Sequence, residues 1–172
     1  TDKFVSGGTF NTNTVNIDFV GNSSDTTFSV DMGIIQHDRQ STDVSNSDIT
    51  SGSYASFTNA LSLTTGNLGT NGDYLITFNC YFDNGSDSQN WVILEIDGST
   101  VATTERMHEI KGKDQKGEDR IITLAHLATD VASGTVIEVK GKTTGGTFGL
   151  HRGTLIIDGI RTTNNIANTI TE

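Results

Sequence analysis

The chain has 172 residues, a formal net charge of −10 and one cysteine, Cys80. This length fits one domain with at most a short appendage, and a lone cysteine excludes an internal disulfide. Because phosphate contacts need clustered cations, the charge argues against nucleic acid as a partner and against an anionic membrane surface. No apolar run approaches the roughly 20 residues of a membrane span. The small residue Thr1 permits removal of an initiator Met, so a complete chain and a fragment of a longer one both remain open.

The composition predicts strands and turns. Thr, Gly, Ser and Asn supply 75 of the 172 residues, and proline is absent. Thr favours strands, whereas Gly, Ser and Asn favour turns. The expected fold class is therefore all-β, a sandwich or barrel with many tight turns.

Residues 1–32 contain two short runs in which apolar and polar residues alternate, separated by the polar turn at 21–25. This pattern predicts a β-hairpin. An isolated hairpin is marginally stable in water, so we expect this segment to pack on a partner. The apolar residues predicted to dock it are Phe4, Phe10, Val15, Ile17, Phe19, Phe28 and Val30.

Residues 33–52 are polar, with Ile34 and Ile35 as their only adjacent apolar pair. We predict a linker or a long surface loop here.

Residues 53–161 carry about eight predicted strands. In the run from Tyr74 to Cys80 every second residue is apolar and falls on one face, while Leu75 and Tyr81 belong to the other. Asp97-Gly98 marks a hairpin turn, and residues 111–119 form a charged loop. This spacing suits a jelly-roll β-sandwich. Residues 162–172 form a polar C-terminal tail.

Four segments of this region resemble the trimeric jelly-roll superfamily of tumour necrosis factor and the complement globular heads. They are GDYLITF from Gly72, VILEIDG from Val92, residues 121–139, and the last strand from Phe148 to Ile157. Two positions depart from the pattern: Thr135 stands where the family usually has Asp, and His151-Arg152 precedes Gly153 where Phe or Ser is common. The resemblance implies a two-sheet jelly roll that trimerises around a three-fold axis.

The segment from Phe4 to Met32 is similar to short hairpin units of fibre and spike proteins of tailed, particularly marine, phages. This second resemblance, beside a compact trimeric head, implies a virion protein. The unit occurs once, so it is not a repeat.

No arrangement of residues predicts catalysis. The four histidines share no metal-ligand spacing, Cys80 lies mid-strand on an apolar face, and no nucleophile elbow or phosphate loop is present. Asp83 to Asp87 has the oxygen ligands of a calcium loop but lacks the closing Glu, so a hairpin turn is the preferred interpretation. We expect no enzyme activity, no cofactor and no metal.

The leading hypothesis is a phage capsid decoration or cement protein, assembled in the host cytoplasm and located in the virion. A homotrimer would dock through residues 1–32 on the major capsid protein or other virion proteins and bridge neighbouring subunits.

Two alternatives remain open. The first is the receptor-binding tip of a tail or head fibre, with a host surface glycan as a partner. The second is a carbohydrate-binding module with Trp91 as its platform. Residues expected to contact a ligand or partner from exposed loops are Asp83, Asn84, Asp87, Trp91, Lys113 and Lys116.

Overall fold

The computed structural model describes residues 5–11, 16–21, 27–31, 35–66, 68, 71–112 and 114–162, and the side chains of those between 37 and 160. The regular structure of these residues is entirely β-strand, in chain order β1 to β11. The chain divides into two compact units, one of residues 1–36 with 161–172 and the other of His37–Ile160. The predicted polar tail lies outside the described residues from 163 onwards.

The first unit contains a three-stranded antiparallel sheet of β1 (Val5–Asn11), β2 (Asn16–Gly21) and β3 (Thr27–Asp31), in that order. The pairing of β2 with β3 confirms the predicted hairpin. The sequence prediction missed β1, which pairs with the other edge of β2. Its Ser-Gly-Gly run has low strand propensity and shows no alternation of apolar and polar residues, so the sequence did not indicate a strand here.

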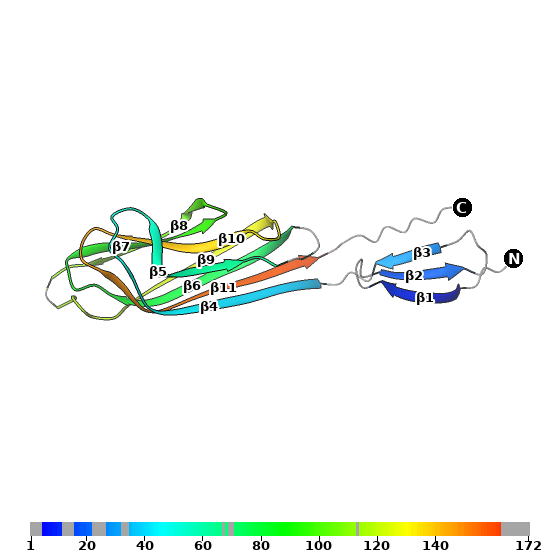
Figure 1. The fold of residues 1–172 in the computed structure, drawn as a ribbon, viewed down its shortest axis with the longest axis horizontal. Coiled ribbons are helices and arrows are strands. Elements are labelled where there is room, and N and C mark those ends of the chain that lie inside the picture. The colour runs from blue at the N-terminus through cyan, green and yellow to red at the C-terminus, as the bar shows by residue number, and fades with distance from the viewer. Residues whose placement is uncertain are drawn as a thin grey trace. The chain divides into compact units, whose positions relative to one another are not determined.

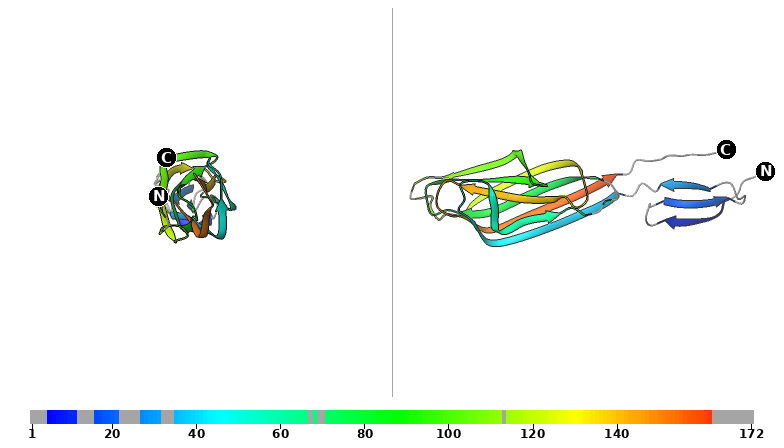
Figure 2. Two further views of the ribbon diagram at one scale, coloured as in Figure 1. Left: turned by 90° about the vertical axis from the view of Figure 1, so that its left-hand side faces the viewer. Right: turned by 45° about the horizontal axis from the view of Figure 1, so that its top comes forward.

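The second unit is a sandwich of two four-stranded sheets (Figures 1 and 2). One sheet has the order β5 (Ala55–Thr64), β10 (Val136–Thr143), β7 (Ser88–Ile96), β8 (Ser99–Ile110). The other has the order β4 (Ile35–Ile49), β11 (Phe148–Thr162), β6 (Gly72–Asp83), β9 (Arg120–Val131). Apart from the β7–β8 hairpin, each strand of this unit is followed by a strand of the opposite sheet, which is jelly-roll connectivity. The predicted fold class is confirmed.

Residues 33–52 are not a linker. Strand β4 occupies positions 35–49 and pairs with β11, so the jelly roll begins well before residue 53. The prediction failed because β4 is an edge strand whose polar side chains bond to the neighbouring edge strand β5. Gln40 Nε2 donates to Thr64 O, and Ser47 Oγ donates to Asn59 O. Of the side chains of this strand that the structure describes, those of residues 37–49, only Val44 and Ile49 pack with the core.

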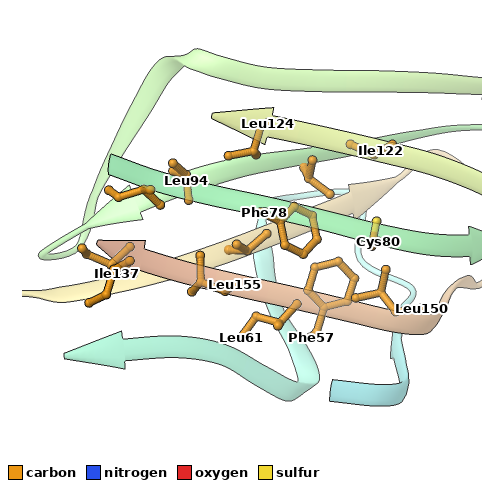
Figure 3. Packing of buried hydrophobic residues seen from close by; sticks show 14 of the residues in the cluster. Phe57, Leu61, Phe78, Cys80, Leu94, Ile122, Leu124, Ile137, Leu150 and Leu155 are labelled. Carbon is orange, nitrogen blue, oxygen red and sulfur yellow. The ribbon is translucent and has the colours of Figure 1, made fainter. Parts of the chain in front are cut away.

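One cluster of buried apolar side chains from both sheets fills the sandwich (Figure 3). Phe148 packs edge-on against Phe57 and Phe82, with ring centroids 5.5 and 4.8 Å apart. Gly141 is required beneath the Phe57 ring, because a Cβ there would lie 2.6 Å from Cζ. The core is therefore held by close aromatic packing in which even one added methyl group would force a shift.

The alternation predicted for β6 is confirmed. Tyr74, Ile76, Phe78 and Cys80 are all buried, whereas Leu75 and Tyr81 on the opposite face are about half exposed, at 49% and 48%. Burial raises the pKa of the Cys80 thiol to about 12, so the thiolate form is disfavoured at neutral pH.

Asp38 joins β4 to the chain between β5 and β6. Its carboxylate accepts hydrogen bonds from Gln40 Nε2 at 2.9 Å, Gly66 N at 2.5 Å and Tyr74 Oη at 2.9 Å. Burial opposes ionisation of Asp38, but these three donors outweigh it and lower the pKa of the group. The ionised carboxylate therefore stabilises the folded chain.

We expect Asp38→Asn to lower the free energy of unfolding by about 1 kcal/mol at pH 7. Because the folded-state pKa is depressed, this contribution is present above the unfolded pKa of about 3.9 and is lost as the pH falls through the folded value. Urea unfolding at pH 7 and pH 3 measures the gap between wild type and variant. A gap that is equal at both pH values would contradict this role of Asp38.

Candidate interaction surfaces

Three predicted loops meet at one end of the sandwich, called here the tip: residues 84–87, 111–119 and 144–147. Gly117 N donates to Asn84 O at 3.2 Å, and Gly112 N donates to Asp87 Oδ1 at 2.9 Å. The third loop joins through Thr144 N, which donates to Gln89 O at 3.0 Å. These bonds fix the loops to one another.

Asn84 does not belong to the exposed surface, contrary to the prediction. Its side chain is completely buried, and Nδ2 donates to Asn90 Oδ1 at 3.0 Å and to Gly145 O at 2.9 Å. Its Oδ1 accepts from Ser86 N at 3.0 Å. An asparagine that satisfies buried backbone groups holds the tip together instead of presenting its side chain to a ligand.

Charged residues of the tip are largely paired within the molecule. Asp87 accepts from Gly112 N, the main reason why its pKa is lowered, and lies 3.3 Å from Lys116 Nζ. Asp83 Oδ1 and Asp119 Oδ1 each lie 3.5 Å from His151 Nε2. Lys113, also predicted to contact a ligand, lies outside the described residues. The tip is thus a rigid surface of mixed charge.

Trp91 belongs to β7 and not to the tip loops, and it lies on the outer face of the sheet β5-β10-β7-β8. The ammonium group of Lys142 stands 4.7 Å from the centroid of its ring and 4.2 Å from that of Tyr54. Lys142 Nζ also lies 3.5 Å from Glu105 Oε1. One face of the indole is therefore covered by a cation of the same chain, which disfavours it as an open sugar platform.

The same outer face carries a second self-contained ionic cluster. Lys140 Nζ lies 2.8 Å from Glu138 Oε2 and 3.5 Å from Glu95 Oε1. The hydrogen bond to Glu138 is the main cause of the raised pKa of Lys140. This face is charged, both of its lysines are paired with carboxylates of the same chain, and it is suited to water.

The outer face of β6 and β9 is different, because it carries no charge over four cross-strand pairs. The register aligns Leu75 with Leu127 and Tyr81 with Ile121, and all four side chains are about half exposed. The pairs between them are Thr77–Ala125 and Asn79–Thr123. We call these eight residues the β6–β9 face. This uncharged, partly apolar face is a candidate interaction surface.

The residues predicted to dock the N-terminal region are only partly covered by the described chain. Phe4 and Val15 lie outside the described residues. The register of the small sheet pairs Phe10 with Ile17 and Ile17 with Val30, and it pairs Phe19 with Phe28. Paired positions, and positions two apart on a strand, belong to one face of a sheet. These five positions therefore belong to one face of the small sheet.

The described histidines have structural surroundings. His108 packs edge-on against Phe82, with centroids 5.6 Å apart, and its pKa is lowered by burial and by the nearby Arg120. Among the described residues, no group of three His, Cys, Asp or Glu side chains is arranged to hold a metal ion. The described residues also include no helix of the length and apolarity needed to cross a membrane.

No protein-family model matches the sequence, and neither does any curated protein. Among solved structures, Eiger TNF from S. frugiperda is 10% identical with a TM-score of 0.49, over 80% of this chain and 98% of that one. The VP2 subviral particle of infectious bursal disease virus is 13% identical with a TM-score of 0.46, over 81% of this chain and 36% of that one. The chain thus spans about a third of the length of VP2. At these identities the likeness extends to the fold alone.

Proposed function

We propose that this protein is a non-enzymatic structural component of a tailed-phage virion, a homotrimer that decorates the capsid and bridges its subunits. The single observation that carries the proposal is the β6–β9 face. Copies that each carry a net charge of −10 repel one another, so stable self-association needs a contact area free of carboxylates. The β6–β9 face supplies such an area, whereas the outer face of the other sheet is occupied by its own ion pairs.

Each of the two units has its own role in this proposal. The jelly roll associates through the β6–β9 face, and the small sheet of residues 5–31 docks on the capsid through the row of apolar positions that its register aligns. A three-stranded sheet of short strands needs a partner surface to bury such a row. The mechanism is mechanical: one trimer holds several capsid subunits in place.

The solution mass tests the trimer directly. Size exclusion with light scattering should give three times the chain mass of 18.4 kDa. A mass of 18.4 kDa across the micromolar range would contradict self-association and, with it, the decoration role as proposed.

Deletion of residues 1–32 tests the docking role. We expect the truncated chain to remain a trimer, because β4 to β11 are intact, but to lose binding to heads assembled without the protein. Co-sedimentation with such heads measures binding, and Lys116→Ala at the tip is the control that should bind like wild type. Head binding by the truncated chain would contradict the assignment of docking to this region.

The construction of the tip favours a second candidate, the receptor-binding end of a fibre. Three loops locked together by Asn84 and Asp87 are a rigid surface of the kind that presents side chains to a ligand. Binding of the purified trimer to host cells, abolished by Lys116→Ala and retained after deletion of residues 1–32, would select this function over decoration.

A further inference from the structure

The sandwich has four edge strands, and two of them cover each other. At the seam between β4 and β5, Ser47 Oγ accepts from Asn59 N at 2.7 Å, and Asn59 Nδ2 donates to Ser45 O at 3.3 Å. Gln40 Nε2 donates to Thr64 O at 2.8 Å further along. Side chains of one edge thus satisfy the backbone of the other, and this seam is closed.

Strand β8 is protected in a different way. Its pairing with β7 shifts between Val92 and Leu94, and the Thr104 hydroxyl accepts from Leu94 N at 2.9 Å in place of a backbone carbonyl. Glu105 and Arg106 follow directly. An irregular edge with charged side chains is a poor template for another strand.

Between Ala128 and Arg120, strand β9 has none of these protections: its pairing with β6 is unbroken there, and positions 121–129 contain no Asp, Glu, Lys, Arg, Gly or Pro. Its one register shift lies between Ala128 and Val131. Strand β8 of the other sheet comes close to β9, but within the described residues no hydrogen bond joins the two. Alternate residues of β9 therefore direct N–H and C=O groups outward without a strand to receive them.

A groove of about 490 Å³ lies beside the C-terminal half of this edge. Its lining combines apolar side chains with two exposed carboxylates, those of Asp97 and Asp130, and it includes no Lys or Arg. The apolar residues that line it are Ile96, Leu127, Ala128, Val131 and Ala132.

We propose that the free edge of β9 and this groove bind an extended segment of a different protein by strand addition. The segment is uncharged along its length and carries Lys or Arg at its N-terminal end. Antiparallel pairing places the N-terminus of the added strand at the C-terminal end of β9, where Asp97 and Asp130 lie. A second copy of this acidic chain is a poor occupant, because two carboxylates and no Lys or Arg line the groove.

Strand addition at the edge of β9 goes beyond the proposed function, which uses the outer face of the sheet, and Leu127 alone belongs both to the groove and to the β6–β9 face. Strand addition would give a decoration protein or a fibre tip a second, sequence-tolerant contact, because backbone hydrogen bonds supply the affinity and the groove supplies selectivity.

The test uses the full chain and a fluorescein-labelled, amidated peptide, Lys-Lys-Thr-Val-Thr-Ile-Thr-Val-Thr. We expect saturable binding by anisotropy, slower amide exchange over residues 121–129, and at least roughly tenfold weaker binding of the peptide that begins Glu-Glu. Equal binding of the two peptides, or no protection of β9, would overturn the proposal.

Matched variants identify the site. Asp97 and Asp130 have positive φ angles of 49° and 58°, which asparagine adopts readily, so Asp97→Asn with Asp130→Asn removes charge without backbone strain. This variant and Thr129→Lys should each bind the basic peptide roughly tenfold more weakly, whereas Thr103→Lys on β8 should bind it like wild type. Light scattering on the same samples reports self-association separately. A rise in mass of the Asp97→Asn, Asp130→Asn variant would assign the edge to a second copy and overturn the proposal.

Discussion

Replacing Leu75 and Tyr81 with glutamate should convert the proposed trimer into a folded monomer. Both side chains are about half exposed, so two carboxylates are tolerated in the isolated chain. In an assembly both carboxylates would be desolvated opposite a partner that is itself acidic. The one at position 75 would lie between Leu127 and Asp158, and the one at position 81 between Ile121 and Arg152, so the larger cost is expected at position 75. We expect the dissociation constant to rise at least roughly 100-fold, which corresponds to about 3 kcal/mol.

Light scattering across a concentration series measures this change, and circular dichroism reports whether the fold is retained. Met107→Glu is the matched control, because Met107 is equally exposed at 50% but lies on β8, in the other sheet. The control should keep the mass of wild type. A double variant with an unchanged mass, or a control that dissociates equally, would show that the β6–β9 face is not the contact.

The sequence was most informative where burial alternates strictly. On β6, apolar residues at every second position predicted the inward face, and the remainder identified Leu75 and Tyr81 as outward. The burial of Ile122 and Leu124 on β9, and the contrast between the exposed Val136 and the buried Ile137, follow the same period. Such alternation is legible because one face of each strand meets the core and the other meets solvent.

The sequence was least informative where side chains replace backbone partners. The sequence of β4 resembles a loop because it is polar. Its polar side chains, such as Gln40 and Ser47, donate hydrogen bonds to the backbone of β5, and no local sequence pattern reveals that β5 is the neighbour. The sequence did not reveal the β6–β9 face either. Leu75 and Leu127 are 52 residues apart in the chain and become neighbours only through the register of β6 with β9. Non-local pairing of this kind requires the topology first.

The burial of Asn84 was not predictable from the sequence either, and substitution of this residue should have a large effect on stability. The turn sequence Asp-Asn-Gly-Ser-Asp indicated exposed oxygen ligands, yet Asn84 is the buried centre of the tip. We expect Asn84→Ala to lower the free energy of unfolding by about 2–4 kcal/mol, because Ser86 N loses its side-chain acceptor, and Gly145 O and Asn90 Oδ1 are left with the single proton of the Thr143 hydroxyl between them. Urea unfolding monitored through Trp91 fluorescence measures the loss.

Asn79→Ala is the control, since Asn79 is an exposed asparagine on β6, and its unfolding free energy should change by less than about 0.5 kcal/mol. Amide exchange separates a local effect from a global one. If Asn84 organises the tip, then Ser86 and Gly117, whose amides bond to Asn84 in the native chain, should exchange faster while the amides of β6 near Phe78 keep their protection. Uniform acceleration would show that Asn84 supports the whole sandwich. Unchanged stability would mean that the three loops hold together without Asn84, and the rigid tip invoked for ligand presentation would lose its physical basis.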